Sequence, residues 1–388
     1  MNTSYNPNSE TLQPKLKVIE GGNGKDHEPV KEKSVSTKPL LLSSAAFVAD
    51  FVPPDYLIDG ILQRQFLYSI TGPTGAGKTA VALLVAMHVA RGLPLAGRDI
   101  EKGKVLFLAG ENPDDVRMRW IKLCEEHNVD PAEVDVVWHP GSLTLSDKDL
   151  RARIEAETEQ HGPFALVIID TSAAFFEGDD ENSNTQLGNH ARTMRSYIGT
   201  VSGGPTILVT THPTKNASPD ALVPRGGSAF LNEVDGNLTC AKQPDNMLVE
   251  VHWYGKFRGP DFAPIPFQLV PGTSEKLKDS KGRSIWTVTA RAISEQEQRH
   301  AQETAREDQD DLLVVMRANP DLVTLTEFAR KVGWFYKDGT PNKTKVNRTL
   351  QALKRAGLVN NARDRWTVTK AGAAAPARRS KPQGEMFR

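Results

Sequence analysis

The residues best suited to chemistry in this chain are a glycine-rich run followed by a lysine and a threonine. The run matches the pattern G-x-x-x-x-G-K-[ST] and comprises Gly72, Pro73, Thr74, Gly75, Ala76, Gly77, Lys78 and Thr79. In this pattern backbone N–H groups surround a phosphate, the lysine reaches the outer phosphates, and the last hydroxyl binds Mg²⁺. A chance glycine loop is the alternative, but a strand-like run precedes the pattern and a helix-forming run follows it. We therefore expect ATP and Mg²⁺ to bind here.

A second candidate is an apolar run that ends in an acid. Residues 166–169 are Leu, Val, Ile and Ile, which indicates a buried strand that delivers Asp170 to the Mg²⁺ ion. Such a run is common by chance, but its place downstream of the glycine-rich run favours the functional interpretation. Thr79 and Asp170 are the expected metal ligands.

Two polar residues close other strand-like runs. The residue directly after Asp170 is Thr171, which cannot serve as the base that activates water. The base must therefore come from another strand, and our candidate is Glu111 at the carboxyl edge of the sheet. A surface glutamate at the start of a helix is the alternative. His212 follows the run 207–211, and we assign it to sensing the γ-phosphate. A lone histidine is otherwise more often a surface polar residue.

Three basic residues are candidates for acting on the phosphates of a neighbouring copy. Arg225 opens a glycine-containing segment, and Lys256 and Arg258 follow a strand-like run. An arginine beside a transferring phosphoryl group stabilises its charge, and a neighbouring subunit often supplies it. A solvated turn explains each of them equally well.

Composition indicates a globular protein of a reducing compartment. The 388 residues are 38% hydrophobic and 25% charged, and the length allows a large α/β domain with a small one beside it. Cys124 and Cys240 lie far apart, which argues against a disulfide framework. No apolar stretch has the length of a membrane span and no signal peptide is recognisable, so we expect a cytoplasmic protein without a membrane partner.

Strand-like and helical runs alternate between residues 41 and 291, which predicts a mostly parallel sheet with helices on both faces. The expected strands cover 66–71, 104–109, 134–138, 166–170 and 206–211, and the expected helices cover 78–91, 114–127, 147–160 and 185–200. Antiparallel strands are expected at 237–242, 247–253, 265–270 and 285–289. Residues 1–40 and 371–388 read as disordered tails, and 292–310 as a charged linker, helical or flexible.

Residues 311–370 are expected to form a small winged helix-turn-helix domain, with helices at 311–318, 325–332 and 343–356 and a hairpin around 360–364. Residues 311–388 hold 16 Lys and Arg against 6 Asp and Glu, whereas the whole chain has 48 of each. This excess favours DNA, single-stranded or duplex, as a partner, with docking on another protein as the alternative. The expected DNA contacts are Lys343, Lys345, Arg348, Lys354, Arg355, Arg363 and Arg365.

The order of these motifs resembles the RepA-type, RecA-fold ATPases of plasmids and phages, which are relatives of the DnaB-type hexameric helicases and of KaiC. The resemblance covers roughly residues 41–270 and also includes an acidic loop at 177–183. It implies a RecA-like P-loop core and a homo-oligomeric ring, a hexamer, with ATP at the subunit interfaces. It further implies roles in cis for Lys78, Thr79, Glu111, Asp170 and His212, and roles in trans for Arg225, Lys256 and Arg258, the last two resembling the paired Lys-x-Arg finger of DnaB-type helicases.

These expectations lead to an Mg²⁺-dependent ATPase that acts on DNA as a RepA-like replicative helicase of a plasmid or phage. The loop 215–223 is the expected DNA-facing loop, and a primase or initiator is a candidate partner. DnaB-type helicases carry an N-terminal collar domain, whereas only a tail is expected here. The alternatives are a DNA-binding ATPase without unwinding activity, such as a loader, recombination mediator or regulator, and a KaiC-like signalling ATPase.

Overall fold

The computed structural model describes residues 41–377 except 182, 244–245, 337 and 363–364, so the tails predicted at 1–40 and beyond 377 lie outside the described residues. The chain divides into a unit that ends at Pro53 and a unit that begins at Pro54. The compact core therefore begins later than the expected start at Leu41. In the described part of the first unit, helix α1 (Ser44–Val48) has no buried residue.

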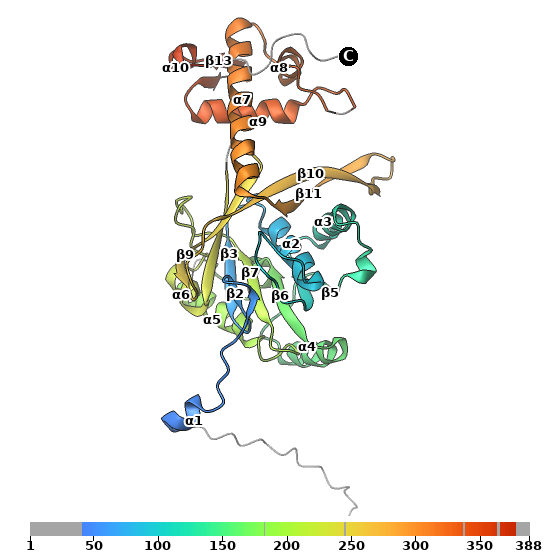
Figure 1. The fold of residues 1–388 in the computed structure, drawn as a ribbon, viewed down its shortest axis with the longest axis vertical. Helices are drawn as coiled ribbons and strands as arrows, with labels where there is room; N and C mark the ends of the chain where they lie inside the picture. Colours follow the sequence, from blue (N-terminus) through green and yellow to red (C-terminus); the bar gives the residue numbers. More distant parts are fainter. Residues whose placement is uncertain (1–40, 182, 244–245, 337, 363–364, 378–388) are drawn as a thin grey trace, which may run out of the picture. The chain divides into compact units, whose positions relative to one another are not determined.

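A nine-stranded sheet lies at the centre of the second unit (Figure 1), in the strand order β11-β10-β9-β8-β3-β7-β6-β4-β5. The strands from β8 to β5 in this order are parallel, and β9, β10 and β11 are antiparallel to their neighbours. The fold class predicted from the sequence, α/β with a mostly parallel sheet, is confirmed. The bounds are β3 (Leu67–Thr71), β4 (Lys104–Ala109), β5 (Val136–Pro140), β6 (Phe164–Asp170), β7 (Thr206–Thr211), β8 (Gly236–Lys242), β9 (Leu248–Phe257), β10 (Ile265–Lys278) and β11 (Ser284–Ala292).

Helices cover both faces of this sheet. Helices α2 (Lys78–Arg91) and α3 (Pro113–Glu126) supply Leu84 and Trp120 to one apolar cluster. Helices α5 (Asn184–Ser196) and α6 (Gly227–Glu233) supply Met194 and Phe230 to the other, and α4 (Lys148–His161) packs against it. Because both faces are covered, β6 is buried at every position and reads as a continuous apolar run.

Short elements complete the core between these helices and strands. A small hairpin of β1 (Tyr56–Ile58) and β2 (Leu62–Gln63) precedes β3, and the sequence analysis did not predict it. The 3-10 turns η1 (Pro131–Glu133) and η2 (Ser172–Phe175) precede β5 and follow β6. None of the helices among the described residues is both long and apolar enough to cross a bilayer.

The linker predicted at 292–310 as helical or flexible is largely helical, and it is continuous with the helix that follows it. A single helix, α7 (Glu295–Ala318), begins at a capping box of Ser294 and Glu297. It is followed by α8 (Leu325–Val332), α9 (Lys343–Arg355) and a hairpin of β12 (Val359–Ala362) and β13 (Arg365–Val368). A last helix, α10 (Lys370–Ala374), occupies the start of the predicted C-terminal tail.

Candidate nucleotide-binding site

The glycine-rich run lies between the end of β3 and the start of α2. Gly77 caps the helix with φ of 96°, and no side chain caps the free N–H groups. A Cβ at Gly77 would lie 2.7 Å from the Cδ2 atom of Leu269. The first turn of α2 also holds no acidic residue. The uncapped N–H groups and the helix dipole therefore suit a phosphate at this position.

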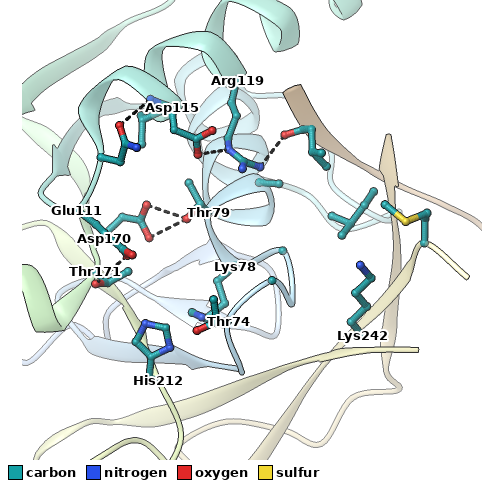
Figure 2. A pocket seen from close by; sticks show the side chains of 18 residues that line it. Thr74, Lys78, Thr79, Glu111, Asp115, Arg119, Asp170, Thr171, His212 and Lys242 are labelled. Carbon is teal, nitrogen blue, oxygen red and sulfur yellow. Dashed lines mark hydrogen bonds and ion pairs between the residues drawn. The ribbon is translucent and has the colours of Figure 1, made fainter. Parts of the chain in front are cut away.

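A cavity of about 370 Å³ opens beside this loop (Figure 2). Its lining includes Lys78 and Thr79 of the loop and three of the polar residues that the sequence singled out, Glu111, Asp170 and His212. These residues come from four different strand ends, so the sheet edge brings them together. Ligands of open α/β sheets bind at such an edge, beyond the carboxyl ends of the strands.

Asp170 lines the cavity and is only 3% exposed. Its Oδ1 accepts a hydrogen bond from Thr210 at 2.6 Å, and its Oδ2 accepts one from Thr79 at 2.9 Å. Burial raises the pKa of Asp170, and the two hydroxyls act in the opposite direction. A hydroxyl and a carboxylate held together beside a phosphate loop fit the coordination of Mg²⁺, which favours oxygen ligands.

Lys78 folds back onto the loop that precedes it. Its Nζ donates to the carbonyl oxygens of Gly72 at 2.8 Å and Pro73 at 3.2 Å. Burial lowers the pKa of this lysine, while the nearby carboxylates of Asp170 and Glu111 oppose that shift. The ammonium is thus held within the cavity, where phosphate oxygens are the partners expected for it.

Glu111 follows β4 and lines the cavity with an exposed side chain. The bond Thr171 Oγ1 to Glu111 Oε2 measures 3.4 Å. Gly110 permits this position, because a Cβ there would lie 2.5 Å from the Phe175 ring. The alternative role, capping α3, belongs to Asn112, whose side chain accepts from the N–H of Asp115. The carboxylate of Glu111 is consequently not used as the cap of α3 and lines the cavity.

His212 follows β7, the strand that lies between β3 and β6 in the sheet. The end of β7 therefore lies beside the ends of β3 and β6, and Figure 2 shows the His212 ring on the same side of Lys78 as Glu111. Burial lowers the pKa of His212. A neutral imidazole offers one donor and one acceptor, which suits a contact with a phosphate oxygen or its bound water.

Two comparisons with known proteins agree with this geometry. The sequence profile of a family described as "AAA domain" (AAA_25) matches residues 32–218. The DNA repair and recombination protein RadB of Methanobrevibacter smithii is 24% identical over 155 residues, which is 37% of this chain and 60% of RadB. The region matched by the family profile contains the glycine-rich loop, Glu111, Asp170 and His212. Residues 32–218 are thus similar to an AAA domain, and the parallel strands with the glycine-rich loop are consistent with a RecA-like P-loop core.

The lining of the cavity also includes residues that the sequence analysis missed. Asp115 and Arg119 lie one turn apart on α3, with Arg119 Nε 2.6 Å from Asp115 Oδ2. The same guanidinium donates to the Val288 carbonyl of β11 at 2.9 Å. The i,i+4 spacing was a signal for the pair. No local pattern pointed to four further lining residues from β8 and the segments that follow it, which are Lys242, Met247, Leu269 and Val288.

Arg225, Lys256 and Arg258 are not among the described residues that line the cavity. Arg225 pairs with Glu181 of the acidic loop. Lys256 Nζ donates to the Asn232 carbonyl at 2.6 Å. Arg258 Nε lies 3.2 Å from Asp235 Oδ1, yet its side chain remains 62% exposed. Within one chain, therefore, these three side chains do not line the cavity among the described residues.

The predicted DNA contacts fall into different environments. Lys343, Lys354, Arg355 and Arg365 are exposed, and Arg348 is partly buried. Lys345 is bound within the chain: its Nζ lies 2.7 Å from Asp308 Oδ1 and 4.4 Å from the centre of the Trp334 ring. These contacts favour a structural role for Lys345 over the predicted phosphate contact. Arg363 lies outside the described residues.

Proposed function

We propose that this chain hydrolyses ATP, with Mg²⁺, and couples hydrolysis to work on DNA. The observation that carries the first part is the convergence of the glycine-rich loop, Glu111, Asp170 and His212 on one cavity. The loop N–H groups and Lys78 bind the outer phosphates. Glu111 orients the attacking water and accepts its proton. His212 contacts the γ-phosphate. Mg²⁺ would be held by Thr79 and Asp170 and would neutralise charge between the phosphates.

The other half of the cavity is proposed to hold the base. The guanidinium of Arg119 is fixed on two sides, by Asp115 and by the Val288 carbonyl. A guanidinium plane can stack on an aromatic ring. The apolar side chains of Val116, Met247 and Leu269 line the same cavity. This combination suits a flat, aromatic base such as adenine.

We further propose a ring of identical subunits, a hexamer, in which Arg225, Lys256 and Arg258 act on ATP bound by a neighbour. This proposal is supported by the absence of these three residues from the described lining of the cavity in their own chain. The exposed Arg258 is the best placed, because the buried carboxylate of Asp235 anchors it without covering it. A finger of this kind typically changes the rate by about 10³-fold or more.

DNA is the proposed partner of the C-terminal part, residues 311–370. Three helices followed by a hairpin have the element order of a winged helix, and exposed cations lie on α9 and at the start of β13. Such cations suit contacts to phosphates. The matched RadB is by name a DNA repair and recombination protein, although this chain spans only about 60% of it. We favour a RepA-like replicative helicase.

The test is the ATPase rate with and without single-stranded DNA at two salt concentrations, followed by unwinding of a forked duplex. We expect strong stimulation that weakens with salt, because phosphate contacts release counterions, and unwinding that needs hydrolysis. Lys78→Ala is the control that must abolish both. An ATPase rate that is the same with and without DNA would overturn the DNA proposal but would still support the ATPase proposal.

A second candidate function is a DNA-binding ATPase that does not unwind DNA. The name of the matched RadB favours it, since that protein is described by repair and recombination. Stimulation by DNA without unwinding, at any fork geometry tested, would establish this candidate in place of the helicase.

A further inference from the structure

We infer that Asn237 is a positioning residue that transmits the nucleotide state of the site to the loop 213–224 and to the segment that carries Lys256 and Arg258. Asn237 lies on β8, beside β3, and its side chain is completely buried. It does not line the cavity and has no place in the chemistry described above. Its hydrogen bonds, however, connect the strands of the nucleotide site with the loop 213–224 and with the segment that carries Lys256 and Arg258.

All four hydrogen-bonding positions of the Asn237 side chain are used. Its Oδ1 accepts from Ser69 Oγ at 2.9 Å and from Thr71 Oγ1 at 2.6 Å. Its Nδ2 donates to the carbonyl oxygens of Leu222 at 2.9 Å and Tyr254 at 3.0 Å. Carbonyls can only accept, so the amide orientation follows from its partners. A buried network satisfied in this way holds its members in one arrangement.

The acceptor side of Asn237 leads to the phosphate end of the site. Thr71 is the last residue of β3 before the glycine-rich loop, and its hydroxyl lies 2.7 Å from that of Thr211. Thr211 is the last residue of β7 and directly precedes His212. Since the Thr71 proton goes to Asn237, the Thr211 hydroxyl donates to Thr71. A displacement of the end of β7 would therefore move the Thr71 hydroxyl and, through it, the Asn237 side chain.

The donor side leads to the loop. Residues 213–224 leave and return to the sheet edge at one place, with Thr214 N bonded to Val223 O at 3.1 Å and Arg225 N bonded to His212 O at 2.8 Å. Pro213 and Pro224 form a β-bridge there. The bond from Asn237 to Leu222 pins the returning strand of this loop to the sheet.

The second carbonyl that accepts from Asn237 Nδ2, that of Tyr254, lies in a bulge of β9. The pairing of β8 with β9 jumps from Leu238↔Trp253 to Gly236↔Phe257, so Asn237 faces the extra residues of β9. A bulge redirects the strand beyond it. Here the redirected residues include Lys256 and, just after the strand, Arg258. The bond to Tyr254 therefore ties the direction of both cations to the same amide.

The network thus links the subunit's own phosphate-facing strands to a surface loop and to the cations proposed to act on a neighbour. The inference rests on the proposed nucleotide site but on neither DNA nor unwinding. A chain whose ATPase rate does not respond to DNA can still show nucleotide-dependent cleavage of the loop 213–224. Failure of the DNA proposal and failure of this inference are therefore distinguishable.

The experiment measures tryptic cleavage after Lys215, which is the one Lys or Arg in 213–224, in the full chain with ADP and with ADP–beryllium fluoride. We expect the two states of the wild type to differ by about fivefold or more, the low end of typical coupling between sites. In Asn237→Asp, which keeps the acceptors and removes both donors, cleavage should rise and the difference should fall below about twofold.

Three further variants guard against misfolding. Thr71→Val cuts the link between β7 and Asn237 and should also abolish the difference, whereas Thr71→Ser keeps the hydroxyl and should restore it. Thr239→Val is the matched control: it lies on the same strand, and its hydroxyl bonds only the His252 carbonyl, at 3.1 Å, among the hydrogen bonds described. Binding of a fluorescent ATP analogue, measured for every variant, shows that the site is intact.

The inference is overturned if the wild type shows no difference between the two states. It is equally overturned if Thr71→Val and Asn237→Asp keep the difference, or if Thr239→Val loses it to the same extent. Should Asn237→Asp fail to fold, the Thr71→Val and Thr71→Ser pair decides the question alone.

Discussion

Glu111 and Asp170 are two carboxylates in one cavity with different surroundings. Asp170 is almost fully buried and is held by two threonine hydroxyls. Glu111 is exposed and touches only Thr171 at 3.4 Å among the hydrogen bonds described. Two carboxylates in unlike environments commonly divide their work. We assign Asp170 to the metal and Glu111 to the water.

Glu111→Gln should keep ATP binding and lose turnover, because the amide still orients water but cannot accept its proton. We expect kcat to fall by about 10² to 10⁴-fold, the usual contribution of a general base, with little change in the Kd for ATP. Single-turnover hydrolysis and equilibrium binding measure the two quantities. Glu133→Gln, at an exposed position of η1 outside the cavity, is the control. A Glu111→Gln chain with normal turnover would refute the assignment.

Arg119→Ala should raise the KM for ATP about tenfold and leave kcat nearly unchanged, since stacking on the base is the same in the ground and transition states. Steady-state kinetics measure both constants. Arg117→Ala is the matched control, because Arg117 lies on the same helix and pairs only with exposed Asp114 in the contacts described. A fall in kcat with constant KM would place Arg119 at the phosphates and contradict the proposal.

At the scale of elements, the order of the parallel strands decides which residues meet. Strand β7 lies between β3 and β6, so its end stands beside both the glycine-rich loop and Asp170. The antiparallel strands β9 to β11 extend the sheet on the other side of β8 and supply the remaining wall of the cavity. One sheet therefore provides residues at both the proposed phosphate end and the proposed base end of the cavity.

Helix α9 carries exposed cations, Lys343 and Lys354, and one cation that is paired within the chain, Lys345. We therefore expect substitutions of the first two to affect DNA binding and a substitution of the third to affect stability. Lys343→Ala and Lys354→Ala should weaken DNA binding for all sequences, and each should lower the slope of log K against log salt by about 1, because each removes one cation from a phosphate. Lys345→Ala should instead lower the melting temperature and leave that slope unchanged, because it removes the pair with Asp308 and the interaction with Trp334. Salt titrations and thermal melts measure the two effects. An equal decrease in slope for all three variants would return Lys345 to the DNA surface.

At the scale of the whole molecule, a finger that acts in trans makes activity a property of the assembly. Lys78→Ala and Arg258→Ala chains should each be inactive alone and should regain activity on mixing. About a quarter of the interfaces in an equal mixture then combine an intact loop with an intact arginine. The ATPase rate against mixing ratio measures this. Mixtures that stay inactive while co-assembling would show that Arg258 does not act across the interface.

Folding stability should fall as the medium becomes acidic. Burial lowers the pKa of five histidines, His88, His127, His139, His190 and His212. The unfolded chain therefore binds more protons than the folded chain below about pH 6.5. Asp170 and Asp308, whose pKa values burial raises, act with the opposite sign, but they are fewer.

Thermal melts of the nucleotide-free protein should show a lower melting temperature at about pH 5.5 than at about pH 7.5, with most of the decline beginning near pH 6.5. His190→Gln should reduce the decline, because His190 is nearly buried and contacts Ser172. A melting temperature that is constant or rises on acidification would show that the two aspartates outweigh the histidines.

The sequence alone determined the glycine-rich loop, the buried strand ending in Asp170 and the alternation that makes a mostly parallel sheet. Each of these depends on neighbouring residues: a phosphate loop needs its glycines in order, and a strand buried on both faces must be apolar along its length. Helix α7 shows the limit of such reasoning. Its capping box and its helix-forming residues were visible at Ser294, yet its charge allowed a flexible linker as well.

Only the tertiary structure decided which distant residues meet. Arg119 is fixed by a carbonyl on β11, Lys345 is withdrawn by Asp308 of α7, and Asn237 joins β3 to Leu222 and Tyr254. These partners are set by strand order, by the bulge in β9 and by helix packing. Local propensity carries no information on such pairings, because they depend on the register and packing of elements far apart in the chain.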